Sequence, residues 1–444
     1  MPPEPIAEIA TFIHDLSEAN IPMELRPFVE RRFIDTVGVL MAGARKEPAV
    51  TLQRQLASMK RSHPEAPLIT AERGFVLGTS GHCLDFDDST HSTHAHVSVA
   101  LVPTIIALSH TRSISGLQAY EGYIAGFETA HYLAELIMEE HYTMGWHGTG
   151  TVGVFAATGA AAKIFALDVS EIETALCMAA SMPAGLRANF GSMTKPLHAG
   201  LAVRSGLTAV LQTAAGITAN SAAMTGKHGF FDVYVPNIDC SERKPKKLGT
   251  TWGAQREGAN TKLYPCCHEI HAGLEAAVQL TTIHETELDK IESIEITAAP
   301  LVVSNTNIRH PTTPAEAKFS MSYVIASALI YGEVTLETFT QDRIDDPAIH
   351  NLETRITLES DETTRTSYST SIEIVDSDGT RITQTNHNPP GKDRTVTEEQ
   401  LKSKFEMCTQ YLSEVERRQV YEFLSNLTEQ QDISFLQGYC YPNV

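Results

Sequence analysis

The first half of the chain has the hydrophobic spacing of α-helices. Near its start, apolar residues recur three or four positions apart, at Ile6, Ile9, Phe12, Ile13 and Leu16. This spacing places them on one face of a helix. Similar spacing continues to about residue 220. We therefore expect a large domain built from packed helices.

Two of the expected helices, at 117–139 and 150–167, are rich in alanine and glycine. Because small side chains let helix axes approach closely, we predict that these segments lie at the centre of a helical bundle. Asp168 follows the second segment, with Glu171 three positions later. This pattern is typical of a helix N-terminus and predicts a further helix there.

The pattern changes after residue 220. Periodicity fades between about 221 and 260, which indicates a long connection. Beyond it, polar and apolar residues alternate as in half-buried strands, at 291–297, 353–359, 370–375 and 380–385. Asp378-Gly379 lies between the last two segments, where a hairpin turn is needed. A strong helical pattern at 315–332 accompanies them, so we expect a smaller α+β region.

The end of the chain returns to helical spacing. Thr397 and Gln400 form a capping pattern at the start of TEEQLKSKFEMC, which we expect to pack back on the first domain. The chain is thus predicted to be mainly α-helical. Residues 1–255, completed by 396–444, would form the helical domain, and residues 256–395 the smaller α+β domain.

The charge balance restricts the class of ligand. The 444 residues include 34 Lys and Arg against 54 Asp and Glu, a formal net charge of −20. Such a field repels nucleic acids and anionic membranes, so we expect neither as a partner. The one basic run, 243–247, contains Pro245 and lacks aromatic residues, and we interpret it as a solvated loop. An anionic ligand would need a local basic pocket.

Cysteine usage and apolar segments bear on the compartment. Seven cysteines form an odd number without a C-x-x-C motif, which suits free thiols in a reducing compartment. The first residues lack the basic and apolar regions of a signal peptide, and no stretch reaches about 18 uninterrupted apolar residues. We therefore expect a cytoplasmic protein without a secretory signal or a membrane span.

Carboxylates and imidazoles are concentrated in one segment, which contains Asp85, Asp87, Asp88, His91, His94 and His96. Both groups bind zinc or iron well, so a metal site is one interpretation. However, the segment has no helical H-x-x-x-H pair and no cysteine at ligand spacing. The same groups suit acid–base chemistry, because histidine titrates near neutrality beside a carboxylate that orients it. A solvated helix end is the third interpretation.

Residues 148–153 read Gly-Thr-Gly-Thr-Val-Gly and formally match the dinucleotide-binding pattern G-x-G-x-x-G. That site needs a buried strand immediately before the glycines. Here HYTMGW precedes them, after a predicted helix. We therefore predict no dinucleotide cofactor and expect the glycines to allow close backbone packing at a helix start.

Two further segments place basic side chains between apolar helices. Lys195 precedes Pro196, which biases its backbone away from helix, and a lysine in such a break can face a cavity and bind an anion. Lys262 lies close to the adjacent Cys266 and Cys267. These cysteines could supply a thiolate nucleophile or metal ligands, but buried structural thiols are the commoner outcome.

In this order, the motifs resemble the MmgE/PrpD family. They are a DFDD run with a histidine-rich turn, GWHGTGTVGVFAATGAAAKIFALD, GLRANFGSMTKPLHAGLAVRSG, YPCCHEIHAGLEAA, AKFSMSYVIASAL and PPGKDRTVTEEQLKSKF. The resemblance covers about residues 5–425. It implies a large helical domain with a smaller α+β lid, a homodimer, and neither a cofactor nor a metal.

Similarity to the decarboxylases of this family implies a set of active-site residues, namely Asp85, Ser89, His96, His147, Lys195, Lys262 and Tyr323. The family often has threonine at the position of Ser89. The histidine-rich turn also carries one more residue than expected, so His94 could occupy the position assigned to His96.

The resemblance also suggests roles for these residues. Lys195 and Lys262 would neutralise substrate carboxylates, with His147 as a further donor. His96, oriented by Asp85, would transfer the proton at carbon. Tyr323, reaching from the lid, would donate a hydrogen bond to a carboxylate or to a leaving hydroxyl.

The family includes 2-methylcitrate dehydratase, cis-aconitate decarboxylase and iminodisuccinate epimerase, whose reactions all pass through an enolate-like centre beside carboxylates. We therefore expect a lyase that acts on a citrate- or aconitate-type tricarboxylate. Dehydration of 2-methylcitrate or a longer alkylcitrate ranks first, cis-aconitate decarboxylation second and epimerisation of a dicarboxylate third. The alternatives from other classes are a metal-dependent enzyme that uses the 85–96 cluster and a non-catalytic helical scaffold.

Overall fold

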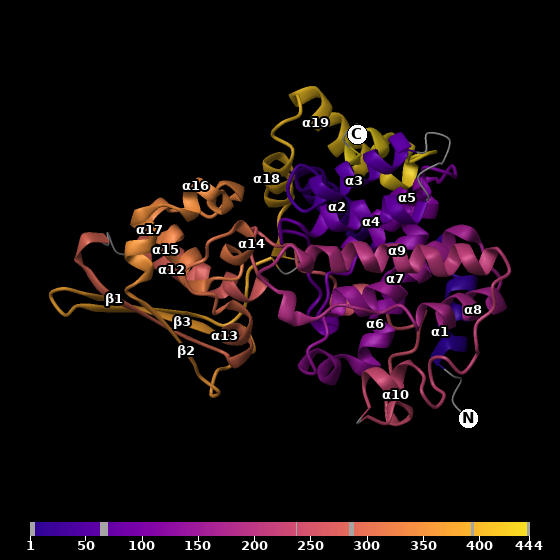
Figure 1. The fold of residues 1–444 in the computed structure, drawn as a ribbon, viewed down its shortest axis with the longest axis horizontal. Helices are drawn as coiled ribbons and strands as arrows, with labels where there is room; N and C mark the ends of the chain where they lie inside the picture. The colour runs from indigo at the N-terminus through magenta and orange to yellow at the C-terminus, as the bar shows by residue number, and fades with distance from the viewer. Residues whose placement is uncertain (1–4, 63–69, 237, 284–287, 392–394, 442–444) are drawn as a thin grey trace.

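A body of packed helices occupies one side of the molecule, and a four-stranded sheet with its own helices occupies the other (Figure 1). The computed structural model describes residues 5–62, 70–236, 238–283, 288–391 and 395–441. The predicted fold class, mainly helical with a smaller α+β part, is confirmed.

Residues 5–256 contribute nine longer helices and two short ones to the helical body within the described residues. These are α1 (Pro5–Asp15), α2 (Leu25–Gly43), α3 (Ala49–Ser62), α4 (Thr70–His82), α5 (Ser98–Leu108), α6 (Gly116–Thr143), α7 (Gly148–Phe165), α8 (Val169–Ala179), α9 (Thr194–Ala214), α10 (Phe230–Tyr234) and α11 (Gly253–Arg256). As predicted, the helical pattern extends to about residue 220 and α8 begins after Asp168, whose side chain accepts a hydrogen bond from the Glu171 backbone.

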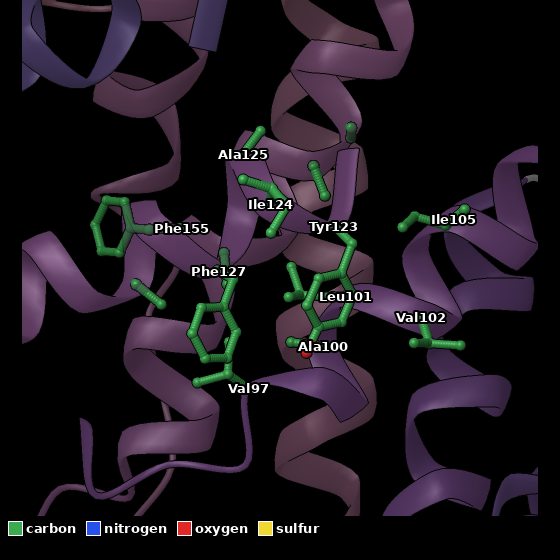
Figure 2. Close-up of a cluster of buried hydrophobic side chains, with 14 of the residues drawn as sticks. Val97, Ala100, Leu101, Val102, Ile105, Tyr123, Ile124, Ala125, Phe127 and Phe155 are labelled. Atoms are coloured by element: carbon green, nitrogen blue, oxygen red, sulfur yellow. The ribbon is translucent and has the colours of Figure 1, made fainter. Parts of the chain in front are cut away.

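The centre of the body is formed by α5, α6 and α7, whose apolar side chains meet in Figure 2. The two helices rich in small residues, α6 and α7, pack closely. A Cβ atom added at Gly126 would lie 2.4 Å from the backbone oxygen of Ala156, so only glycine fits there. This contact confirms the predicted central position of both helices.

The glycines at 148–153 start α7, and no strand precedes them, because α6 ends at Thr143. A Cβ atom at Gly150 would lie 2.2 Å from the backbone oxygen of Ala184. The glycines therefore permit close backbone packing, as predicted, and the context of a dinucleotide site is missing here.

The sheet has the strand order β2-β1-β3-β4 and is formed by β1 (Ile291–Ala298), β2 (Ile356–Ser360), β3 (Thr370–Asp376) and β4 (Arg381–Asn386). β1 runs parallel to β2 and antiparallel to β3, which pairs antiparallel with β4 through the predicted turn at Asp378-Gly379. Gly379 has a φ of 85°, which favours glycine. β2 begins later than predicted, because residues up to Glu353 belong to a helix.

The α+β part also contains helices. In chain order they are α12 (His271–Ile283), α13 (Pro300–Thr306), α14 (Pro314–Ala317), α15 (Met321–Tyr331), α16 (Gln341–Ile344) and α17 (Pro347–Glu353). Of these, α12, α13 and α15 pack against the sheet. The single helix predicted at 315–332 is wrong. It is divided into α14 and α15, because the Ser320 side chain accepts a hydrogen bond from the Tyr323 backbone and caps a new helix. The break between them contains Lys318 and Phe319.

The C-terminal segment forms α18 (Glu398–Cys408), α19 (Glu414–Ser425) and α20 (Gln437–Cys440). The predicted cap at Thr397 and Gln400 is present, and α18 packs on α2, as expected for a tail that returns to the body. Buried residues form one core from 6–259 and 396–440, and another from 266–374. The domain limits proposed from the sequence stay a prediction.

Three other expectations can be compared with the structure. Within the described residues, no helix combines the length and the apolar character needed to cross a bilayer. The basic run 243–247 lies in a loop against α6, where Arg243 pairs with Glu140. All seven cysteines are free thiols, and Cys266 and Cys267 are buried.

Candidate active site

A pocket of about 50 Å³ lies between the helical body and the α+β part. It brings together most of the residues implied by the family resemblance, namely Asp85, Ser89, His94, His96, His147, Lys195 and Lys262. The α+β part contributes His268, Glu269, Phe319 and Tyr368 to the opposite wall. Residues distant in the sequence thus converge on one site.

The buried carboxylate of Asp85 lies between two lysines. The Lys195 ammonium pairs with Oδ1, and the Lys262 ammonium donates hydrogen bonds of 2.8 Å to both Oδ2 and the backbone oxygen of Asp85. Although burial would raise the pKa of Asp85, the two ammonium groups hold it well below its ordinary value. Asp85 is therefore ionised and holds both lysine side chains in place.

The two lysines retain hydrogen-bonding capacity for a ligand. An ammonium group has three N–H donors, of which Lys195 uses one and Lys262 two in contacts with Asp85. The remaining donors can bind an anion. Since Lys195 and Lys262 are only 5% and 1% exposed, their bonds to a carboxylate would form away from bulk water and be strong.

Local structure directs Lys195 into the pocket. It lies in the first turn of α9 with Pro196, a position where proline is tolerated because the first helical N–H groups have no partner within the helix. Its ammonium lies 5.2 Å from the ring centre of Phe190 and 4.7 Å from that of Phe319. These rings come from both sides of the site and stabilise the charge.

The carboxylate that orients His96 is Asp87. Asp87 Oδ2 lies 3.2 Å from His96 Nδ1 and 2.8 Å from His82 Nδ1. Although burial raises the pKa of Asp87, these two imidazoles hold it well below its ordinary value. The assignment of Asp85 to this role is therefore wrong, because Asp85 is held by the two lysines.

The contact with Asp87 determines which nitrogen of His96 can react. Because Nδ1 faces the carboxylate, Nε2 is the atom left for a ligand, and the imidazole can exchange a proton there. The His96 side chain is 13% exposed, in agreement with its place in the pocket wall. Sequence inspection missed His82, although it lies only three positions before Asp85.

The loop that carries these carboxylates is anchored by a buried network. Arg32 Nη1 lies 3.3 Å from Asp88 Oδ2, and Nη2 of Arg32 donates a hydrogen bond of 2.7 Å to Thr261. Ser98 also donates to Asp88. Asp88 is thus a structural anchor, and its place beside Asp87 explains the acidic run DFDD.

His147 precedes α7 and is a neutral imidazole. Its Nδ1 lies 3.0 Å from Nδ1 of His198, a partner that the sequence did not indicate. Burial and the nearby Lys195 ammonium lower the pKa of His147 well below its ordinary value, and burial lowers that of His198 to about 4. His147 can therefore donate a hydrogen bond to a ligand through Nε2 without adding a charge.

Ser89 connects the body to the α+β part. Its hydroxyl lies 2.9 Å from Nδ1 of His268, whose pKa is lowered to about 3 by burial and by Lys262. The Ser89 backbone also forms two hydrogen bonds with Asn260. Ser89 therefore lies in the pocket wall, as predicted, at the junction of the two parts.

His94 and His96 both line the pocket but have different partners. The His94 ring stacks on Tyr142 with ring centres 4.5 Å apart, and its backbone has a φ of 42°. Among the described residues, its ion-pair contact is with the exposed carboxylate of Glu139, 3.9 Å from Nε2, which is beyond hydrogen-bonding distance. His96 beside Asp87 is thus the better acid–base group.

Tyr323 is not a pocket residue, and this prediction is wrong. It lies in α15, where its hydroxyl donates a hydrogen bond of 2.6 Å to the Thr338 backbone oxygen, and its ring packs in the second core. The tyrosines that line the pocket are Tyr142 and Tyr368. Tyr368 accepts or donates a 2.7 Å hydrogen bond with His91 Nδ1.

The wall formed by Cys267 and Glu269 carries a negative charge. The Cys267 thiol donates a hydrogen bond of 2.7 Å to Glu269, and Asn305 donates another of 3.2 Å. Burial raises the pKa of both Cys266 and Cys267, which argues against a thiolate nucleophile. Since Glu269 repels anions, a bound acid would direct its carboxylates toward the two lysines.

The predicted 85–96 metal cluster does not form as a unit. Asp85 contacts lysines, Asp88 contacts Arg32, and His91 contacts Tyr368. Only Asp87 and His96 join a possible ligand set, with His82 as the third member and ligand atoms within 4.8 Å of one another. His82 is hydrogen-bonded to the Asp87 carboxylate and His96 Nδ1 lies 3.2 Å from it, so the set fits an acid–base group as well as it fits a metal.

Comparison with known protein families shows to which family this chain belongs. Residues 7–242 match the MmgE/PrpD N-terminal domain, and residues 264–428 match the MmgE/PrpD C-terminal domain. The chain belongs to the MmgE/PrpD family. The resemblance seen in the sequence motifs is thereby confirmed.

Named relatives of this MmgE/PrpD protein are cis-aconitate decarboxylases. It is 25% identical to that of Homo sapiens over 79% of this chain and 75% of the relative. It is 26% identical to that of Mus musculus over 89% of this chain and 85% of the relative. It is also 22% identical to a cis-aconitate decarboxylase-like protein of Aspergillus oryzae over 93% and 92%. The prediction of a lyase of the MmgE/PrpD type is confirmed.

Proposed function

We propose that this protein is a cofactor-independent decarboxylase of a cis-aconitate-type tricarboxylate. The observation that carries the proposal is the convergence of Lys195 and Lys262 on Asp85, beside the imidazole of His96. The names of the relatives favour decarboxylation over the dehydration that ranked first from the sequence. The two lysines would hold two substrate carboxylates.

In the proposed reaction, the bond between carbon and one carboxylate breaks and carbon dioxide leaves. The electron pair of that bond forms a new double bond to the neighbouring carbon. The electrons of the existing double bond move to the carbon beside a remaining carboxylate, where they form an enolate. Free N–H donors of Lys195 and Lys262 stabilise this charge, and each such charge-assisted bond contributes about 1.5–3 kcal/mol. The low exposure of both lysines strengthens the effect.

A proton must then return to carbon. Protonated His96 supplies it from Nε2, because Asp87 holds Nδ1 and stabilises the imidazolium. Neutral His147 donates a hydrogen bond to the substrate and helps to fix its orientation. No metal or organic cofactor enters this scheme.

Dehydration of a 2-methylcitrate-type acid is the second candidate. It needs a base to remove a proton and an acid to protonate the leaving hydroxyl. His96 and His147 both line the pocket and could divide these tasks. The same lysines would stabilise the enolate in either reaction.

The test is to incubate the protein with cis-aconitate, 2-methylcitrate, citrate and iminodisuccinate in D₂O and to identify products by NMR. Decarboxylation predicts carbon dioxide and a product with one deuterium at carbon. Release of water from a citrate would favour the second candidate. Turnover of iminodisuccinate alone would overturn both.

Two accompanying expectations belong to this proposal. A homodimer, implied by the family, is testable by sedimentation velocity at several protein concentrations. The predicted cytoplasmic location is testable by fractionation of cells that produce the full chain.

A further inference from the structure

A second, larger cavity adjoins the active-site pocket. Its volume is about 710 Å³, within the ~300–1,000 Å³ typical of small-molecule sites. It lies between the body and the segment from α14 to α16, and apolar side chains such as Leu84, Met193, Pro314, Leu336 and Phe339 form much of its wall. The mechanism proposed above does not use this space.

The cavity and the pocket share a boundary. Asp85, Lys195 and Phe319 line both. A group attached to an acid bound at Lys195 can therefore pass directly into the cavity. The cavity is the larger of the two spaces, so an extended substituent would be accommodated there.

The wall of the cavity includes the ammonium group of Lys318, which forms no ion pair within the described residues. Lys318 lies in the break between α14 and α15 and is 8% exposed. No ion pair or hydrogen bond of its side chain occurs within the described residues, and its ammonium lies 5.7 Å from the centre of the Phe339 ring. Burial lowers its pKa to about 8, so it is mainly charged at neutral pH.

The carboxylates around the cavity have other partners. Asp85 is held by Lys195 and Lys262, and Glu316 accepts hydrogen bonds from the backbones of Thr312 and Thr313. Glu47 is exposed and accepts a hydrogen bond from the backbone of Thr51. Because Lys318 lines the cavity without an ion pair among the described residues, an anionic group of a ligand could form a charge-assisted hydrogen bond with it there.

We propose that the cavity binds an apolar arm of the substrate and that Lys318 pairs with an anionic group at the end of that arm. The substrate class would be a polycarboxylate whose reacting head lies at Lys195 and whose extension carries a terminal carboxylate. The inference rests on the proposed function, because the head is the tricarboxylate of that reaction.

The test measures dissociation constants by calorimetry for three acids with the same tricarboxylate head. One has no arm, one has a linear alkyl arm, and one has an equal arm that ends in a carboxylate. We expect the wild-type protein to bind the alkyl-armed acid more tightly than the bare head, and the carboxylate-ended acid about tenfold or more tightly still. One charge-assisted contact accounts for a difference of this size.

Lys318→Met is expected to reduce the preference for the carboxylate-ended arm over the alkyl arm by about 10- to 100-fold. Lys318→Gln provides a second neutral variant should methionine impair folding, and Lys318→Arg should keep most of the preference. Lys46→Met is the matched comparison, since Lys46 lines the same cavity but is exposed. We expect it to change the preference by less than about fivefold.

Three results would overturn the inference. If the alkyl arm adds no affinity, the cavity is only an entrance. If Lys318→Met weakens all three acids equally, Lys318 serves the head and not an arm. If no acid binds, the proposed function itself fails, and this inference fails with it. The first two results leave binding of the bare head intact and are therefore distinguishable from the third.

Discussion

Lys404 in α18 donates a hydrogen bond of 2.7 Å to the backbone oxygen of Phe86, the residue that separates Asp85 from Asp87 in the sequence. Its ammonium also lies 2.5 Å from Asp35 Oδ1 in α2, and both side chains are almost completely buried. The C-terminal helices thus hold the loop that presents Asp85 and Asp87.

Replacing Lys404 by methionine should therefore destabilise the protein. The substitution removes the ammonium group beside the buried Asp35 carboxylate. Breaking a buried ion pair in this way typically lowers the free energy of unfolding by about 3–5 kcal/mol. We also expect kcat to fall, because the Phe86 carbonyl loses its donor. Urea denaturation and turnover of the remaining folded protein would measure the two effects.

Lys402→Met is the matched control for this prediction. Lys402 lies on the same helix, is exposed, and is 4.0 Å from Glu406. It should change stability by less than about 1 kcal/mol. The double variant Asp35→Asn with Lys404→Met should recover part of the stability, and failure to do so would argue against a charge effect.

Lys195→Met and Lys262→Met should each lower kcat/KM by roughly 10²–10³. This is the scale expected for loss of one preorganised group that stabilises developing charge. The two losses should not add, because both lysines share Asp85. Steady-state kinetics of the single and double variants would test this, with Lys402→Met as the control for removal of a surface charge.

Asp87→Asn should reduce kcat by about 10²–10⁴ with little change in KM, because it removes the partner that orients His96. The pH profile of kcat should also move. Asp85→Asn should instead raise KM, because Lys195 and Lys262 lose their common partner. If Asp85→Asn moves the pH profile and Asp87→Asn does not, the assignment made from the sequence is right after all.

The fold should lose stability as the pH falls from about 6.5 toward 4. Burial lowers the pKa of several histidines to about 3 or 4, namely His82, His131, His141, His198 and His268. In the unfolded chain they bind protons near pH 6.5, so the unfolded state gains protons first. Thermal denaturation between pH 5 and pH 8 would show this dependence.

His131→Asn provides a control outside the pocket for that prediction. It removes one buried histidine and should make the decline of Tm with falling pH less steep. An unchanged Tm from pH 8 to pH 5 in the original protein would contradict the prediction, because it would show that folding does not lower the pKa of these histidines.

Added zinc should inhibit the enzyme, and a chelator should leave turnover unchanged. The Nδ1 atoms of His82 and His96 and the carboxylate of Asp87 could bind the metal together, which would remove Asp87 from its role beside His96. Inhibition assays with the wild type and with His82→Asn would test this. Loss of turnover on chelation, restored by metal, would instead support the metal-dependent alternative.

Features governed by short-range rules were predictable from the sequence. The turn at Asp378-Gly379 and the caps at Asp168 and Thr397 appear where expected, because each depends on a few adjacent residues. Glycine at 148–153 was also interpreted correctly, since the absence of a preceding strand is visible in the sequence.

Partnerships between distant residues were not predictable in the same way. Asp85 and Asp87 are two positions apart, yet one faces lysines and the other histidines, because Asp85 adopts a left-handed backbone with a φ of 50°. Tyr323 was assigned to the pocket from its motif, but α15 is buried over residues 321–329 and shows no polar face to orient it. The family motifs therefore identified most residues of the site, whereas the contacts between those residues became visible only in the folded structure.

The two walls of the active-site pocket belong to parts of the molecule that have separate hydrophobic cores. A movement between the cores would carry Phe319 away from the Lys195 ammonium, while Lys195 and Lys262 would stay paired with Asp85. An acid would then meet charges that are already assembled, and the return of Phe319 would exclude water from around them.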